Sequence, residues 1–441
     1  MIARLFGRRA RQGAWAMSEY IAYPLFMFLA TPFFLKFLGQ SAYGQWMLVL
    51  VFTGFGGLSG LGMGSSSVKE VSAAMGRDDR AAAAYTTRIC LAVTLISGLV
   101  FSALFFAVSY FFGKQLFQRM GAWSEVWPLF AFAAILVFLE QVDQVFAGTI
   151  RGLERFDLLA RIEASSKLLM VVAALAAAWI SSNLWLVLVV VSFITLVRLA
   201  TKMYFASKLL SRPLYVPAWN KARALEIFHF GKWVWLQSMG SSIFSTADRL
   251  IVGSLLGATD LARYSICLQL AQQIQTVPAA GAQILFPAIS NRIGAGQDFR
   301  KLAIYGSFAV AAMAVIFGLF VWLFAYSILS LWVGPTIALS STETLKLLAV
   351  AFVVLGINVG PHFGLYGLGR AGVVAIINSI SGCVAIIIAV VAIPHFGIIG
   401  AGYAKLGYGL IVCLDIVVFW KVIVRENQNY LNVKLNTGAN K

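Results

Sequence analysis

Charged side chains interrupt several long apolar segments of this sequence, and they are the residues best suited to chemistry. A basic side chain at the centre of a bilayer costs at least about 2.5 to 3.5 kcal/mol, so such residues normally face a cavity or a charged partner. A cavity with surplus cations selects an anion, and arginine suits phosphate because its planar fork donates two parallel hydrogen bonds. The candidates for binding an anionic substrate are Lys36, Arg198, Arg249, Lys346 and Lys405.

These five basic residues differ in predicted depth. Lys36 and Lys346 lie close to helix ends, from which their amines can reach the membrane surface. Arg198 lies in the inner half of its segment, from which its side chain can also reach the membrane surface. Arg249 and Lys405 lie deeper, so we expect these two to face a cavity.

Acidic residues lie in the same apolar segments. Glu140, Asp143 and Gln144 are spaced i, i+3, i+4 and so share one helix face. One interpretation is an interhelical salt bridge, with Arg198, Lys405 or Arg249 as partner. The other is an ion-coupling site for H⁺ or Na⁺, because desolvation can raise the pKa of a carboxylate into the working range. Asp248 and Asp415 are further candidates for such a site.

The composition shows what must position these charges. The 441 residues are 60% hydrophobic and only 12% charged, with a net charge of +17. A soluble domain is about half apolar and a quarter charged, which excludes a soluble enzyme. The chain is expected to be an all-α polytopic membrane protein in which short connections leave no room for a soluble catalytic domain.

Apolar runs long enough to cross a bilayer, about 20 residues each, recur along the whole chain. The predicted transmembrane helices are about twelve, at 14–38, 43–63, 89–112, 127–150, 168–180, 184–205, 233–256, 264–289, 302–332, 345–365, 373–393 and 401–424.

Basic residues concentrate in every second connection. The N-terminal segment contains Arg4, Arg8, Arg9 and Arg11. Most of the 34 basic residues are predicted to lie on the same side of the membrane as this segment. Basic loops stay in the cytoplasm, which predicts a plasma membrane protein with both termini cytoplasmic. The positive charge then fixes orientation and contacts anionic membrane lipids, so nucleic acid is not an expected partner.

The two halves of the chain resemble each other. Gly39 and Gly257 each follow a predicted helix, and the turn 152–155 matches 367–370 about 215 residues later. Six helices in each half imply two parallel six-helix lobes around a central cavity, the plan of many transporters. The predicted division is an N-terminal lobe at 1–207, a cytoplasmic inter-lobe linker at 208–232, and a C-terminal lobe at 233–441 with a short cytoplasmic tail.

No cofactor chemistry is expected from this sequence. The four cysteines, Cys90, Cys267, Cys383 and Cys413, lie inside predicted spans, which disfavours a disulfide framework or a metal cluster. No Gly-Lys-Ser/Thr phosphate loop occurs in the sequence, which disfavours ATP hydrolysis. We therefore expect no catalytic residue, no metal and no cofactor other than a coupling ion.

Four stretches carry a family resemblance. Residues 35–46 (LKFLGQSAYGQW), the following 60–63 and 68–70, and 248–257 (DRLIVGSLLG) resemble the polysaccharide-transport branch of the multidrug/oligosaccharidyl-lipid/polysaccharide exporter superfamily, which includes the Wzx-type O-antigen flippases. Asp248 and Arg249 fall on the Asp-Arg pattern of that family. Ala262 stands where many relatives have glycine.

The resemblance implies a flippase rather than an enzyme. The implied cargo is an undecaprenyl-diphosphate-linked oligosaccharide, an O-antigen or exopolysaccharide repeat unit, moved across the bacterial inner membrane by alternating access coupled to an ion gradient. Membrane lipids, a polysaccharide polymerase and a chain-length regulator are the implied partners.

Two other functions compete with this interpretation. A cation-coupled multidrug exporter of the same superfamily would have similar lobes but organic cations as cargo. A membrane glycosyltransferase or polymerase would need charged residues in outer connections, which here carry only Lys114, Arg119 and Arg263 as basic groups.

Overall fold

The structure, a computed structural model, describes residues 2–54, 61–282, 285, 289, 298–368 and 370–424. All regular secondary structure in these ranges is helical. The first elements are α1 (Ile2–Gly54), α3 (Met63–Gly76), α4 (Arg80–Leu116), the 3₁₀ turn η1 (Gln118–Met120), α5 (Trp123–Gly152), α6 (Phe156–Ser181), α7 (Leu184–Leu210), α8 (Lys221–Leu256) and α9 (Ala258–Ala282). They are followed by α11 (Arg300–Leu323), α12 (Ala325–Val333), α13 (Pro335–Gly367), α14 (Ala371–Phe396) and α15 (Ile398–Val412). The predicted all-α class is confirmed.

Eight segments of the described residues are long and apolar enough to span a membrane, from Arg80–Leu116 to Ile398–Val424. They overlap the predicted spans at 89–112, 127–150, 168–180, 184–205, 302–332, 345–365, 373–393 and 401–424. The described residues leave out parts of two predicted spans: 55–60 of the span 43–63, and much of the end of the span 264–289. They also leave out the tail 425–441. The chain is thus a multi-pass membrane protein.

Two predicted spans differ in extent from the helices. The span predicted at 168–180 belongs to α6, which begins at Phe156 and includes Glu163, an acid that neighbouring helices bury rather than one placed in a loop. The span predicted at 302–332 is divided at Phe324 into α11 and α12. In both cases hydropathy alone misplaced the helix end.

The chain forms two compact units, Met1–Ser265 and Ile266–Lys441. Helix α8 begins at Lys221, inside the predicted linker 208–232, because the Asn220 side chain accepts a hydrogen bond from the Arg223 N–H and caps the helix. The predicted division into lobes at 1–207 and 233–441 stays a prediction.

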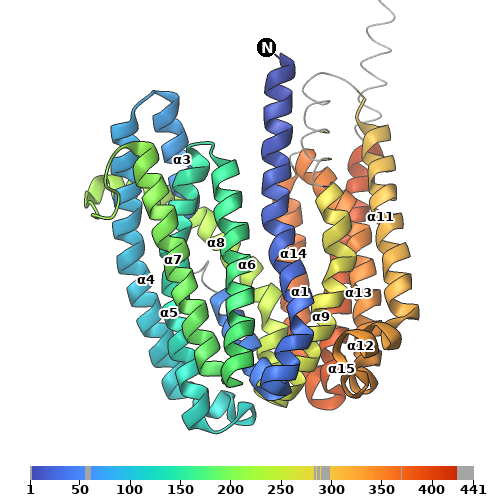
Figure 1. Cartoon of the computed structure of the whole chain (residues 1–441). Helices are drawn as coiled ribbons and strands as arrows, with labels where there is room; N and C mark the ends of the chain where they lie inside the picture. Colours follow the sequence, from blue (N-terminus) through green and yellow to red (C-terminus); the bar gives the residue numbers. More distant parts are fainter. Residues whose placement is uncertain are drawn as a thin grey trace, which may run out of the picture. The chain divides into compact units, whose positions relative to one another are not determined.

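Within the first unit, α5 packs against its neighbours along much of its length. Helices α5 and α7 lie side by side, as do α6 and α7 (Figure 1). Helices α3 and α5 approach so closely that a Cβ atom on Gly148 would lie 2.2 Å from the Gly64 carbonyl oxygen. Beside this crossing, the hydroxyls of Ser67 and Thr149 are hydrogen bonded at 2.9 Å. α5 is therefore a central element of this unit.

The internal duplication extends to backbone geometry. Gly39 (φ 78°, ψ 170°) and Gly257 (φ 95°, ψ −174°) share a conformation that is essentially restricted to glycine. Leu153 (φ −83°, ψ 7°) and Leu368 (φ −86°, ψ 4°) also match, and each leucine N–H donates to the carbonyl four residues earlier at 3.0 Å. Both pairs were aligned by sequence alone, so the turns of the two halves are structural equivalents.

Candidate functional site

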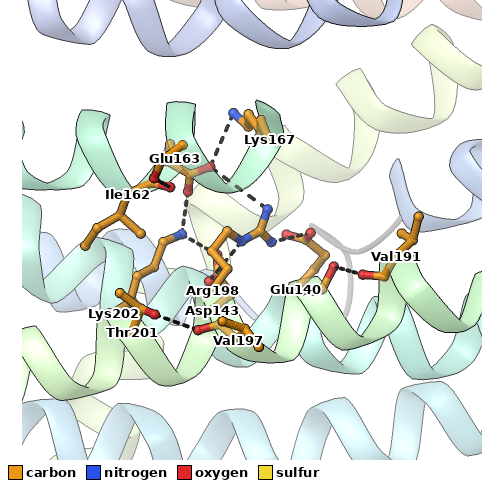
Figure 2. Close-up of polar contacts among 12 residues, drawn as sticks. Glu140, Asp143, Ile162, Glu163, Lys167, Val191, Val197, Arg198, Thr201 and Lys202 are labelled. Atoms are coloured by element: carbon orange, nitrogen blue, oxygen red, sulfur yellow. Dashed lines mark hydrogen bonds and ion pairs between the residues drawn. The ribbon is translucent and has the colours of Figure 1, made fainter. Parts of the chain in front are cut away.

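Three helices of the first unit bring six charged side chains together (Figure 2). Each helix contributes two residues three or four positions apart, the spacing that puts both on one face. We call this group the N-terminal charge network; its members are Glu140 and Asp143 of α5, Glu163 and Lys167 of α6, and Arg198 and Lys202 of α7.

Arg198 and Lys202 hold the acids of α5 and α6 in place. The Arg198 guanidinium donates from Nη2 to Glu140 Oε1 at 2.5 Å and from Nε to Asp143 Oδ1 at 3.4 Å. The Lys202 ammonium donates to Asp143 Oδ2 at 2.5 Å and to Glu163. Lys202 thus bridges two carboxylates, whereas Arg198 contacts three, because its Nη1 also lies 4.0 Å from Glu163 Oε2 (Figure 2). The network joins α7 to both α5 and α6.

The centre of the network is out of contact with solvent. The side chain of Lys202 is 0% exposed and that of Asp143 is 1% exposed. Three acids and three bases make the group formally neutral, which offsets the large cost of placing separate charges in an apolar interior. Arg198 is therefore paired with acids of its own chain, as the salt-bridge interpretation of Glu140 and Asp143 expected. A coupling role for those acids stays a prediction.

Sequence reasoning missed Glu163 and Lys202 as members of this group. Neither was selected as a candidate, although Lys202 lies four residues after Arg198 and Glu163 four residues before Lys167. Glu163 and Lys167 form an ion pair at 3.3 Å. That recurring i, i+4 spacing was the available signal, but only the packing of α6 shows that Glu163 is buried.

A second polar group lies in the other unit, where α13 packs against the spanning segment Ile398–Val424. Asp415 is 0% exposed. Its Oδ2 accepts a hydrogen bond from Asn358 Nδ2 at 3.2 Å and lies 3.4 Å from His362 Nδ1. The ring of His362 packs edge-on against Tyr366, with centroids 4.8 Å apart. Sequence reasoning selected Asp415 but not Asn358 or His362.

Asp248 and Arg249 are adjacent on α8, so their side chains leave the helix on different faces. Asp248 is buried and accepts a hydrogen bond from the Tyr264 hydroxyl at 2.5 Å. Arg249 is half-buried, and so is Lys405 on α15. The structure places these two cations in helices of different units.

The remaining basic candidates lie closer to solvent or lipid. Lys36 is exposed on α1. Lys346 on α13 forms an ion pair with Glu343 at 2.9 Å, and its amine lies 5.6 Å from the centroid of the Trp322 ring. A lysine held by an exposed acid and an aromatic face is already satisfied at the protein surface.

No metal cluster is present among the described residues, which contain no group of three or more His, Cys, Asp or Glu side chains able to hold a metal. The four cysteines are free thiols: Cys90 and Cys267 are buried, Cys413 is half-buried and Cys383 is exposed.

Two protein families match this sequence. The family described as "Polysaccharide biosynthesis protein" matches residues 10–292, and the MatE family matches residues 234–391. A curated relative from Shigella flexneri, named "Putative O-antigen transporter", is 22% identical over 377 residues. The match covers 82% of this chain and 85% of the relative.

Solved structures share the fold at low sequence identity. An inward-facing multidrug resistance MATE family transporter of the MOP superfamily has a TM-score of 0.69 and 16% identity, over 94% of this chain and 99% of that one. A MOP superfamily transporter from Pyrococcus furiosus has a TM-score of 0.57 and 17% identity, with 96% of both chains covered. With a family match that covers more than half of its residues, the chain belongs to the polysaccharide biosynthesis protein family, in the polysaccharide-transport branch of the multidrug/oligosaccharidyl-lipid/polysaccharide exporter superfamily.

Proposed function

We propose that this protein is a flippase for undecaprenyl-diphosphate-linked oligosaccharide, an O-antigen or exopolysaccharide repeat unit. The observation that carries the proposal is the similarity, along 82% of the chain, to the Shigella flexneri relative named "Putative O-antigen transporter". The fold supports it, because solved structures with the same fold are transporters. Transport rather than catalysis is therefore the proposed activity.

Cationic side chains within the helices are the proposed contacts of the diphosphate. Arg249 and Lys405 are the proposed diphosphate-binding residues. Both are half-buried within helices, and a diphosphate accepts several charge-assisted hydrogen bonds. Arg198 is a weaker candidate, because two carboxylates already accept hydrogen bonds from its guanidinium. Lys36 and Lys346 fit contacts at the membrane surface.

The proposal includes a location and a driving force. Excess basic residues in alternate connections support an inner membrane protein with both termini in the cytoplasm. We propose alternating access driven by an H⁺ or Na⁺ gradient, with Asp143, Glu140, Asp248 and Asp415 as the acids to test. A polysaccharide polymerase and a chain-length regulator are the proposed protein partners.

The decisive experiment removes the gene and follows the lipid-linked oligosaccharide. Accumulation on the cytoplasmic leaflet, reversed by the wild-type gene, is the expected result. Arg249→Gln and Lys405→Gln should restore membrane insertion but not export, whereas Lys69→Gln, a change at an exposed residue, should restore both. Unchanged export in the deletion strain would refute the flippase proposal.

A multidrug exporter is the second candidate, favoured by the MatE match at residues 234–391. Its cargo would be an organic cation, which a cationic side chain such as Arg249 repels. Measuring drug susceptibility in the same deletion strain separates the two. Increased sensitivity to cationic drugs, with normal oligosaccharide export, would support the exporter instead.

A further inference from the structure

The connection between α7 and α8, residues 211–220, is a fixed part of the first unit rather than a free linker. Leu214 is 0% exposed and packs in the apolar core of that unit. Arg88 on α4 holds the connection at two points: its Nε donates to the Val216 carbonyl at 2.6 Å, and its carbonyl accepts from the Ala218 N–H at 3.1 Å. Figure 1 shows this segment beside α4, at the edge of the unit. We call residues 211–220 the α7–α8 loop.

The α7–α8 loop exposes large apolar side chains. Tyr215, Val216 and Trp219 are 63%, 45% and 60% exposed. Because Leu214 and Arg88 fix the backbone around them, these side chains cannot turn into the core without breaking those contacts. Tyrosine and tryptophan combine an apolar ring with a polar tip, and both are enriched where a membrane meets water. The exposed rings are therefore suited to the boundary between lipid and water.

Helix α4 shows how deep in the membrane this loop lies. Ile96 and Leu99 are 56% and 64% exposed within a segment that is long and apolar enough to span a membrane, so they face lipid. Arg88, which holds the loop, lies about two turns before Ile96, or about 12 Å along the helix. The headgroup layer on each side of a bilayer is about 5–8 Å thick. The loop thus lies within reach of the lipid headgroups.

Positive charge is concentrated on the loop and on the helix ends beside it. Three basic side chains there are exposed: Lys208, Arg212 and Lys221. With the residues that the structure describes, none of these three side chains forms an ion pair or a hydrogen bond. The sequence between Glu163 and Glu226 contains no acidic residue, and Glu226 is paired with Arg223 at 2.5 Å. The loop therefore presents cations that the described part of its own chain does not neutralise.

We propose that the α7–α8 loop is a binding surface for the headgroups of anionic phospholipids. The rings of Tyr215 and Trp219 enter the headgroup layer, while the three exposed bases contact lipid phosphates. Basic residues beside a membrane are attracted to anionic lipid, and a lipid surface supplies both the apolar and the anionic contacts that this loop lacks. The surface goes beyond the proposed flippase activity and does not depend on the cargo. Only its assignment to the cytoplasmic leaflet rests on the proposed orientation.

Lipid contact is measured by fluorescence quenching in the purified full-length protein, reconstituted in nanodiscs of phosphatidylcholine with a minority of phosphatidylglycerol. Brominated acyl chains, which quench tryptophan on contact, are placed either on the phosphatidylglycerol or on the same amount of phosphatidylcholine. The signal of Trp219 is the fluorescence lost on Trp219→Phe, in each protein tested. We expect brominated phosphatidylglycerol to quench this signal more strongly than brominated phosphatidylcholine, and high salt to reduce the difference.

Removal of the basic side chains should reduce the preference for phosphatidylglycerol. Arg212→Gln should lower this preference by about 2- to 5-fold, and the triple variant Lys208→Gln, Arg212→Gln, Lys221→Gln should abolish it. Lys114→Gln is the matched control, because Lys114 is also an exposed base but lies at the opposite end of α4 from Arg88. This control should retain the preference of the wild type.

Three outcomes would overturn the surface. A Trp219 signal that neither brominated lipid quenches would place the loop in water and favour a soluble protein partner. Equal quenching by the two brominated lipids would show an interfacial loop without selection for anions. A preference that survives in the triple variant would contradict the role of the bases; if that variant fails to fold, a wild-type preference that salt does not change decides the same point. None of these results depends on oligosaccharide export, so each leaves the flippase proposal standing.

Discussion

Replacing Lys202 with methionine should destabilise the first unit substantially. Methionine preserves most of the length of the side chain but removes the charge. The ammonium is 0% exposed and contacts both Asp143, at 2.5 Å, and Glu163. Its loss leaves the network with three acids and two bases, and removing one partner of a buried ion pair costs about 3–5 kcal/mol.

Thermal unfolding in detergent, followed by tryptophan fluorescence, measures this cost. A change of 1 kcal/mol shifts the midpoint of a domain of 150–250 residues by about 2–4 °C, so a decrease of about 6–20 °C is expected. The control is Lys69→Met, because the Lys69 side chain is 52% exposed and its ion pair with Glu70 spans 3.6 Å. A surface pair contributes about 0–1 kcal/mol, so this control should unfold close to the wild type.

A second substitution separates charge balance from lost packing. Adding Glu163→Gln to Lys202→Met leaves two acids and two bases, so the double variant should be more stable than the sum of the single effects by about 0.5–3 kcal/mol. A Lys202→Met midpoint within about 1 °C of the wild type would refute the buried network. Strictly additive effects in the double variant would refute charge compensation as its cause.

Two further predictions concern glycines. Gly148→Ala should destabilise the protein by about 1–3 kcal/mol, because its Cβ would meet the Gly64 carbonyl at 2.2 Å; Gly76→Ala, with nothing within 4 Å, is the control, and equal unfolding midpoints would contradict the close crossing. Gly39→Ala and Gly257→Ala should each cost about 1–3 kcal/mol for the backbone conformation. Gly257→Ala should cost more, because its Cβ would lie 2.4 Å from a backbone carbonyl, and the reverse order of midpoints would contradict this reasoning.

The sequence predicted the fold class because a membrane helix is a local feature. About 20 consecutive apolar residues are enough to span a bilayer, so the segments at 89–112 and 373–393 could be identified without any tertiary information. The same holds for Gly39 and Gly257, since the residue type itself permits the backbone conformation. Helix ends were less predictable, as in α6, which includes Glu163, a charge that becomes buried only on packing.

Only the tertiary structure decided which charges compensate one another. The spacing of Glu140 and Asp143 placed both on one face of a helix, but a single helix contains no information about what that face contacts. Lys202 and Glu163 belong to the network because α6 and α7 pack together, while Asp415 has no comparable base beside it in the described residues. The sequence identified some of the ionisable groups within the apolar segments, and packing determined which of them are neutralised by partners in their own chain.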